Sequence, residues 1–216
     1  MNKKGLQLLP YDSEDTLEIG IDEAGRGCLI GRVYIAGVIL PSDFKELCEE
    51  NDIIIKDSKK MSAKNKEKSR IFIENNALDY AIVYKENDRI DDINIFQATM
   101  EGMHDVIDKI TIKPEKILVD GNYFRTYKDY SNKNKVIEHK CVVKGDDTYM
   151  SIASASILAK TYKDEYIKDL VEEHPELYKY DLLNNSGYGT QNHIEAIKIY
   201  GISNFHRKTF GICKNY

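Results

Sequence analysis

The sequence predicts an α/β fold in which a mixed sheet is covered by helices. Two observations favour it: short apolar runs with strand periodicity come early in the 216-residue chain, and helical patterns lie between and after them. The length fits one domain with a sizeable core, and no repeat or Pro- or Gly-rich linker marks a boundary. We therefore expect residues 17–216 to form a single domain, preceded by an N-terminal extension over residues 1–16.

The predicted strands are short apolar segments. Leu17, Ile19 and Ile21 alternate with polar or small residues, which is the two-residue period of a strand. A glycine-rich turn follows this strand, and an Asp-Gly turn ends the fourth. The other strands are expected over residues 33–40, 80–84 and 116–120, with a further one over 136–143.

Helical periodicity predicts four helices. The longest begins with small residues (SIASASILAK), which permit close packing of its first turns against a sheet. The last is short, with Thr190 as its N-cap and Gly201 as its C-cap. The expected ranges are 62–75, 93–110, about 148–173, and 190 to just before 201.

Composition limits the class of protein. The longest apolar run, residues 33–40, is far short of the ~20 residues that span a bilayer, and the N-terminal residues do not resemble a signal peptide. We therefore expect a soluble, cytoplasmic protein with no membrane partner. The cysteines are far apart and form no CxxC pair, so buried or inert thiols are favoured over a disulfide or zinc site. They are Cys28, Cys48, Cys141 and Cys213.

Charge is unevenly distributed along the chain. The net charge of -5 gives no general attraction to nucleic acid. Between residues 56 and 70, however, seven basic residues accompany two acidic ones. A solvated helix face is the usual meaning of such a run, and a phosphate-contacting patch is the alternative.

Carboxylates lie at the ends of three predicted segments. Asp22 and Glu23 close the first strand, Asp120 closes the fourth, and Asp146 precedes the long helix. Asp22 and Glu23 can share one site only if the strand ends or bends there, which the following glycines allow. If the two strands are neighbours and the helix packs over their ends, the carboxylates meet. Their repulsion then favours a hard divalent cation such as Mg²⁺.

Each carboxylate also has a structural interpretation. An Asp before Gly is common in turns, and an Asp before a helix is commonly its cap, which is the role expected for Asp147. Taken singly, Asp120 and Asp146 are better explained as structural residues. The pair Asp22 and Glu23 is harder to explain in this way, because a glycine-rich segment with a lone Arg follows it directly.

These motifs resemble those of type 2 ribonucleases H, the ribonuclease HII family. A lone Asp-Glu pair would be a weak indication, whereas six motifs in the family's order are specific. In chain order they are GIDEAGRG (20–27), DSKKMS (57–62), VDG (119–121), KGD with SIASASILAKTYKDE (144–165), GYGT with a following His (187–193) and HRKTF (206–210).

The resemblance implies a ribonuclease H-like fold, with a central mixed β-sheet flanked by helices and a small helical C-terminal portion. It implies that the catalytic metal ligands are Asp22, Glu23, Asp120 and Asp146. It also implies a loop and a tyrosine that read the 2′-hydroxyl at an RNA-to-DNA junction, which here are Gly25, Arg26, Gly27 and Tyr188. We further expect Lys59, with Ser58 and Lys60, to position a phosphate of the substrate. A Gly-Tyr-Gly stretch can also be a simple turn with a packed ring.

The activity implied is that of an endonuclease using two Mg²⁺ ions, or Mn²⁺ in their place. Such an enzyme cleaves the RNA strand of RNA/DNA hybrids and cuts 5′ of ribonucleotides embedded in duplex DNA, leaving 3′-hydroxyl and 5′-phosphate ends. Its roles would be the removal of RNA primers and of misincorporated ribonucleotides. We expect a monomer, and the C-terminal residues contain no clear peptide for binding a replication clamp.

The chain departs from the family pattern after Gly27. Cys28 and Arg32 stand where the family usually has prolines, so we expect a less rigid loop and a contact of Arg32 with substrate. Lys160 and Asp164 also match the pattern, but their helical position assigns them first to packing and salt bridges. A functional role is less strongly indicated for His193 and His206, and His193 is expected to be packed or to face solvent.

Two other functions fit parts of the pattern. A junction-resolving or transposase-type nuclease of the same fold would keep the acidic cluster and cut DNA without needing a 2′-hydroxyl. A non-catalytic nucleic-acid-binding subunit is the second, but four carboxylates facing a polyanion disfavour it. Ribonuclease HIII differs by a DES-type motif and an N-terminal domain, for which residues 1–16 are too few.

Overall fold

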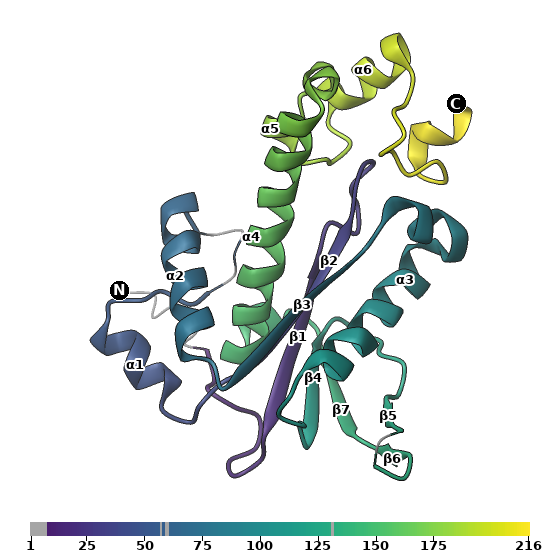
Figure 1. Ribbon diagram of the computed structural model, residues 1–216. Coiled ribbons are helices and arrows are strands. Elements are labelled where there is room, and N and C mark those ends of the chain that lie inside the picture. The colour runs from purple at the N-terminus through teal and green to yellow at the C-terminus, as the bar shows by residue number, and fades with distance from the viewer. Residues whose placement is uncertain (1–7, 57, 59–60, 131) are drawn as a thin grey trace.

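A five-stranded mixed sheet runs through the centre of the computed structural model, which describes residues 8–56, 58, 61–130 and 132–216 (Figure 1). The strand order is β3-β2-β1-β4-β7. β1 pairs antiparallel with β2 and parallel with β4. Farther out, β2 pairs antiparallel with β3, and β4 pairs parallel with β7. The strands are β1 (Glu18–Ala24), β2 (Val33–Ile39), β3 (Asp79–Lys85), β4 (Lys116–Asp120) and β7 (Glu138–Val142).

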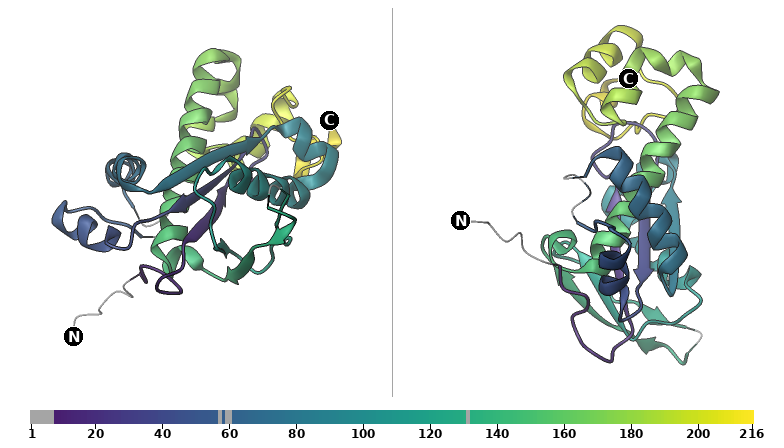
Figure 2. Two further views of the ribbon diagram at one scale, coloured as in Figure 1. Left: turned by 60° about the horizontal axis from the view of Figure 1, so that its bottom comes forward. Right: turned by 90° about the vertical axis from the view of Figure 1, so that its left-hand side faces the viewer.

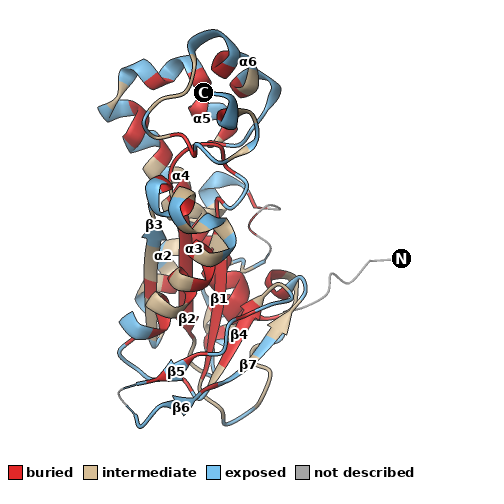
Figure 3. Cartoon of the chain, turned by 90° about the vertical axis from the view of Figure 1, so that its right-hand side faces the viewer, coloured by how far each residue is buried: buried red, intermediate tan, exposed pale blue. Residues whose placement is uncertain are grey.

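Helices cover both faces of this sheet. α3 lies on one face, and α4, with α1 and α2 outside it, lies on the other (Figure 2). Buried residues follow β1, β2 and β4 between these layers (Figure 3). The helices are α1 (Phe44–Glu50), α2 (Ala63–Asn76), α3 (Asn87–Lys109), α4 (Met150–Glu173), α5 (Leu182–Asn185) and α6 (Gln191–Tyr200). Short 3₁₀ turns are η2 (Gly145–Asp147), η3 (Pro175–Tyr180) and η4 (Gly211–Asn215), and β5 (Lys128–Asp129) pairs with β6 (Lys135–Val136).

The first turns of α4 lie very close to β1. Gly20 of β1 has no side chain at the contact, and a Cβ there would lie 2.3 Å from the backbone carbon of Ser151. This confirms the close packing that the small residues of α4 predict. Because side chains alternate along a strand, Asp22 points to the same α4 side of the sheet as Gly20.

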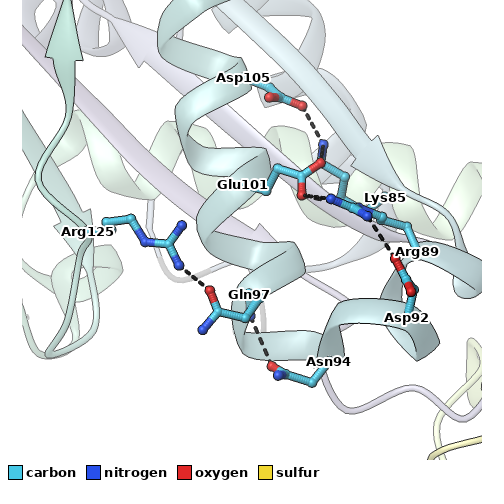
Figure 4. A network of polar contacts seen from close by, with 8 residues as sticks. All are labelled: Lys85, Arg89, Asp92, Asn94, Gln97, Glu101, Asp105 and Arg125. Carbon is cyan, nitrogen blue, oxygen red and sulfur yellow. Dashed lines mark hydrogen bonds and ion pairs between the residues drawn. The ribbon is translucent and has the colours of Figure 1, made fainter.

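α3 is bent at Asn94, whose φ of 68° and ψ of 162° are not helical. The Asn94 Oδ1 accepts the Gln97 N–H at 3.1 Å, so Asn94 caps the second part of the helix (Figure 4). Farther along, Glu101 accepts hydrogen bonds from Lys85 at 2.6 Å and Arg89 at 2.7 Å. The pair with Lys85 joins α3 to the end of β3, and the pair with Arg89 joins the two parts of α3 across the bend.

The C-terminal residues form a second, smaller core at one end of α4 (Figure 1, yellow). Leu170 of α4 and Ile197 of α6 cluster there with Leu29 and Ile30, which lie between β1 and β2. The segment between β1 and β2 is therefore packed against the C-terminal part of the chain. This confirms the predicted helical C-terminal portion.

Most predicted elements are present, and the differences have local causes. Thr190 accepts the His193 N–H and Gly201 ends α6, as predicted. Asp147 as the cap of α4 is wrong, because it lies inside η2 and the helix begins after Tyr149. α1 and the polar first part of α3 were not predicted.

The cysteines are free thiols, as their spacing predicts. Cys28, Cys48 and Cys213 are buried free thiols, and Cys141 is a partly buried one. Among the described helices, none combines the length and apolarity that crossing a membrane requires.

Candidate active site

The carboxylates of β1 and β4 meet at one edge of the sheet. The parallel register pairs Ile21 with Val119, so the next residues along each strand are Asp22 and Asp120. β1 stays paired with β2 through Ala24 and turns only at Gly25, whose φ of 91° favours glycine. The regular part of the strand therefore includes Asp22 and Glu23, and it is the pairing of β1 with β4 that ends beside them.

A cavity of about 480 Å³ opens at this edge. Three of the four predicted metal ligands line it, together with all the predicted reading residues and Ser58. Ser156 was not predicted, and Lys160 was assigned to packing. The lining side chains used below are Asp22, Glu23, Asp120, Ser58, Ser156, Lys160, Arg26 and Tyr188.

Asp146 is placed differently from the other three carboxylates. It is buried in η2 and is not among the residues that line the cavity. Its neighbour Gly145 donates its backbone N–H to Asp120 Oδ1 at 2.7 Å. The segment that contains Asp146 is thus attached to the end of β4. We call Asp22, Glu23, Asp120 and Asp146 the carboxylate edge.

Asp22 is in an unfavourable environment for a charged carboxylate. It is 5% exposed, and burial raises its pKa well above the usual value, with further contributions from Glu23 and Asp120. Hydrogen bonds from Ser156 and from the Glu23 N–H, the latter at 2.7 Å, act in the opposite direction. A cation beside these groups would remove the cost of keeping them ionised.

The donor set fits a hard divalent cation. Among the residues that the structure describes, no three His, Cys, Asp or Glu side chains form a ready-made metal cage. Mg²⁺ does not need one, because it is usually held by one or two carboxylates with water and substrate phosphate. All the candidate ligands are carboxylate oxygens, and Asp22 already lies beside two like charges.

Ser58 is the one described residue among the three that are predicted to position a phosphate of the substrate. It is buried, and its hydroxyl lies 3.2 Å from that of Ser156. Because Ser156 also hydrogen-bonds Asp22, this contact connects the segment around Ser58 to the carboxylate edge. Lys59 and Lys60 lie outside the described residues.

The loop after β1 lies against Tyr188. Cys28 and Tyr188 form an antiparallel bridge, and the Leu29 N–H donates to the Gly187 carbonyl at 2.8 Å. A Cβ on Gly27 would lie 3.7 Å from the Tyr188 ring. Arg26 in the same loop forms an ion pair with Glu23 at 3.0 Å, which joins the loop to the carboxylate edge. We call residues 25–32 with Gly187 and Tyr188 the reading region.

Lysines of α4 lie beneath the Tyr188 ring, which is 38% exposed. Lys163 is buried, with its Nζ 5.0 Å from the ring centroid and 2.8 Å from the Ser186 carbonyl oxygen. Lys160 lies 5.5 Å from the centroid and pairs with Asp164 at 3.0 Å. The predicted salt bridge is present, but Lys160 also lines the cavity and is a cation available beside the carboxylates.

Three of the described basic residues in the run over residues 56–70 are held by contacts within the protein. Lys68 donates to two backbone carbonyls of the segment after α1, and Lys66 lies 3.8 Å from Asp164. Arg70 pairs with Glu67 and Glu74. These contacts favour a structural helix face for the described part of the run.

Arg32 is engaged on the outer side of the loop. Its guanidinium carbon lies 4.0 Å from the Tyr84 centroid and 4.4 Å from the Tyr166 centroid, and Nη2 lies 2.8 Å from Glu86. It is not among the residues that line the cavity. The geometry does not support the expected contact of Arg32 with substrate, and these interactions fix the loop where prolines would otherwise stiffen it.

Comparison with known proteins identifies the family. The family model described as Ribonuclease HII matches residues 19–213. The ribonuclease HII of Parabacteroides distasonis is 47% identical over 203 residues, which covers 94% of each chain. That of Bacteroides thetaiotaomicron is 44% identical over 205 residues, covering 95% of this chain and 94% of the relative.

Solved structures share the fold. The ribonuclease H2 of Pyrococcus horikoshii has a TM-score of 0.72 at 24% identity and covers 92% of this chain and 95% of its own. The ribonuclease HII in a PCNA complex from Archaeoglobus fulgidus has a TM-score of 0.72 at 25% identity, with coverages of 91% and 96%. The Bst ribonuclease HIII in complex with Mn²⁺ has a TM-score of 0.66 at 19% identity. The match covers 92% of this chain and 68% of the ribonuclease HIII chain.

The fold class predicted from the sequence is thereby confirmed as ribonuclease H-like. The family match covers the sheet, the cavity and the C-terminal core. The chain belongs to the ribonuclease HII family, metal-dependent enzymes that bind nucleic acid and cleave RNA in RNA/DNA hybrids and at ribonucleotides in DNA.

Proposed function

We propose that Asp22, Glu23, Asp120 and Asp146 hold two Mg²⁺ ions, or Mn²⁺, and that cleavage 5′ of a ribonucleotide leaves 3′-hydroxyl and 5′-phosphate ends. The observation that carries the proposal is the burial of Asp22 beside Glu23 and Asp120 in the wall of a cavity. When bound, the ions supply activation of water and stabilisation of the leaving oxygen.

The residues of the chain orient these ligands. The Gly145 N–H holds one oxygen of Asp120, and Ser156 with the Glu23 N–H holds Asp22. Such hydrogen bonds to ligating carboxylates fix their direction before the metal arrives. Arg26 restrains Glu23 in the same way.

The reading region selects the ribonucleotide. Gly25, Arg26 and Gly27 bring the backbone close to the sugar, and the exposed part of the Tyr188 ring provides a stacking surface beside it. The 2′-hydroxyl is the group that separates RNA from DNA, so polar backbone atoms at this position favour a ribose. Ser58, Lys59 and Lys60 position a phosphate, and Lys160 contributes a cation from the cavity wall.

The chain acts as a monomer on RNA/DNA hybrids and on DNA duplexes that contain ribonucleotides. The ribonuclease HII of Archaeoglobus fulgidus forms a complex with PCNA. A replication clamp is therefore the protein partner to test first.

The test is cleavage of a labelled DNA duplex containing one ribonucleotide, beside an all-DNA duplex and a uniform RNA/DNA hybrid. Each is incubated with Mg²⁺, Mn²⁺ or chelator, using wild type and Asp22→Asn. Glu49→Gln, an exposed carboxylate of α1, is the matched control. Calorimetric titration with Mn²⁺ measures metal binding independently of cleavage.

We expect metal-dependent cutting just 5′ of the ribonucleotide, with loss of both cutting and Mn²⁺ binding in Asp22→Asn and neither loss in Glu49→Gln. Equal cutting of the all-DNA duplex would support a junction-resolving type of nuclease instead. Absence of cutting with either metal would support a binding subunit.

A further inference from the structure

Arg207 is a buried cation whose hydrogen bonds converge on the reading region. Its guanidinium is 0% exposed and donates to three backbone carbonyls: Nε to Gly31 at 2.9 Å, Nη1 to Arg26 at 3.0 Å and Nη2 to Arg32 at 2.9 Å. Burial lowers the pKa of Arg207 to about 10, so the side chain stays charged at neutral pH. Only a planar fork with divergent donors can hold three carbonyls in this way.

The backbone around Arg207 supports the same loop. The Arg207 N–H donates to the Leu29 carbonyl at 2.8 Å, and the Gly31 N–H donates to the Phe205 carbonyl at 2.8 Å. On its other side the loop is paired with Gly187 and Tyr188. The loop therefore lies between two C-terminal segments, and its shape depends on both.

The neighbouring residue, His206, is connected to Tyr188 through a second histidine. The His206 Nδ1 accepts the Ser203 N–H at 2.9 Å, so the ring proton of a neutral His206 must be on Nε2. That nitrogen lies 3.1 Å from His193 Nε2, which therefore accepts. The remaining proton of His193 is then on Nδ1, which donates to the Tyr188 carbonyl at 3.0 Å.

This network assigns one tautomer to each ring and requires both to be neutral. His193 and His206 are fully buried. Burial lowers the pKa of both, that of His206 to about 3, with the neighbouring His193 contributing. The chain of hydrogen bonds is therefore intact at the pH at which a nuclease acts.

We propose that His206 and Arg207 form a positioning unit that sets the loop of residues 25–32 and Tyr188 relative to each other, and so determines selectivity for a ribonucleotide at an RNA-to-DNA junction. The proposal rests on the proposed reading role of Gly25, Arg26, Gly27 and Tyr188. Arg207 fixes the loop, and His206 fixes the Tyr188 backbone through His193.

The spacing between loop and ring explains why positioning matters. A Cβ on Gly27 would be in van der Waals contact with the Tyr188 ring, at 3.7 Å, so the loop backbone lies close to the ring. A displacement of about 1 Å at a reacting group can cost on the order of 10²-fold in rate. Loss of either hydrogen-bonded connection would widen this gap. The Arg26–Glu23 ion pair links the loop to the carboxylate edge, so Mn²⁺ affinity is measured beside selectivity to separate the two effects.

The first experiment exchanges basic residues at adjacent positions. Arg207→Lys keeps the charge but loses the fork, and Lys208→Arg is the matched control at an exposed neighbour. For each, kcat and KM are measured on the single-ribonucleotide duplex and on the uniform hybrid, with Mn²⁺ binding measured by calorimetry. We expect the rate on the single-ribonucleotide duplex relative to the hybrid to fall by up to about 10²-fold in Arg207→Lys only, with Mn²⁺ affinity unchanged.

The second experiment separates hydrogen bonding from packing at His206. His206→Gln can still accept from Ser203 and donate to His193, whereas His206→Met fills a similar volume and can do neither. Both are compared below their melting temperatures. We expect the selectivity ratio to be largely retained in His206→Gln and lost in His206→Met; equal ratios in the two variants would overturn the proposal, even where Arg207→Lys does not fold.

Tyr188→Ala distinguishes the positioning role of His206 and Arg207 from the reading role on which it rests. If Tyr188→Ala leaves the selectivity ratio unchanged, the reading role itself fails and the positioning role fails with it. If Tyr188→Ala loses selectivity while folded Arg207→Lys and His206→Met keep it, the reading role stands and only the positioning role is overturned.

Discussion

Three of the four carboxylates of the carboxylate edge line the same cavity as residues of the reading region, but the buried polar groups at the two places are balanced in opposite ways. At the edge, burial and two neighbouring carboxylates oppose the ionisation of Asp22. Against the reading region, the buried side chains of Arg207 and His206 donate hydrogen bonds to acceptors at 2.9 to 3.1 Å. The first region gains stability when a cation binds, whereas the second is already organised before substrate arrives.

The largest expected effect tests Asp146, whose position in the carboxylate edge differs from that of the other members. Asp146 is the only one of the four carboxylates that does not line the cavity, and Asp147 beside it in η2 is not assigned to the metal. Loss of a metal ligand removes several kcal/mol of transition-state stabilisation, or about 10³-fold in rate. We expect Asp146→Asn to lose about this much in single-turnover cleavage at saturating Mg²⁺.

Asp147→Asn is the control for that measurement, because it makes the same chemical change one residue away. We expect its rate to stay within about threefold of wild type. Similar losses in both variants would mean that η2 supports Asp120 through Gly145 and that Asp146 is not a ligand.

The sequence predicted the parts of the site that local patterns determine. Apolar runs with strand periodicity ended at Asp22 and Asp120, and the structure has β1 and β4 adjacent and parallel there. Periodicity cannot show which polar residue of a long helix faces a cavity. Ser156 was therefore missed, and nothing local distinguishes the buried Lys163 from the cavity-lining Lys160.

The contacts of the reading region were harder to predict because they join segments far apart in the chain. Arg207 belonged to a recognised motif, but its role depends on carbonyls of residues 26, 31 and 32. Arg32 was expected at the substrate, and its partners Glu86 and Tyr166 come from the end of β3 and from α4. Sequence spacing carries no information about such pairings.

The next effect is the loss of folding stability in acid that is expected from His206. The pKa of His206 is lowered to about 3 in the folded protein, so the unfolded chain binds more protons between about pH 3 and 6.5. The stability that depends on a neutral His206 is fully present above pH 6.5. As pH falls below that value, the free energy of unfolding decreases by about 1.4 kcal/mol per pH unit. We expect roughly 2 kcal/mol of loss from this residue between pH 6.5 and 5, measured by chemical denaturation.

His206→Gln is the control, since glutamine does not titrate. The wild type should lose about 2 kcal/mol more than this variant over the same pH interval. Parallel losses in the two proteins would show that His206 is accessible to protons in the folded state and that the buried network is not preformed.

A smaller effect is expected where Arg32 holds the loop from outside. Arg32→Ala removes an ion pair with Glu86 and the stacking on Tyr84 and Tyr166. Because these groups are partly exposed, we expect a loss of about 1–2 kcal/mol in unfolding free energy. Glu86→Gln, which removes only the ion pair, should lose less than about 1 kcal/mol. Equal losses would mean that the rings contribute little.

The smallest expected effect is a gain in stability, in contrast to the losses above. The raised pKa of Asp22 means that its ionised form destabilises the fold, so stability is lost as pH rises through that pKa. In chelator near pH 8 we expect Asp22→Asn to be more stable than wild type by about 1 kcal/mol, or ~2–4 °C in Tm. Saturating Mn²⁺ should reverse the order, because it binds the folded wild type selectively. If chelator-treated wild type melts higher than Asp22→Asn, the carboxylate edge is not strained, and its contrast with the reading region disappears.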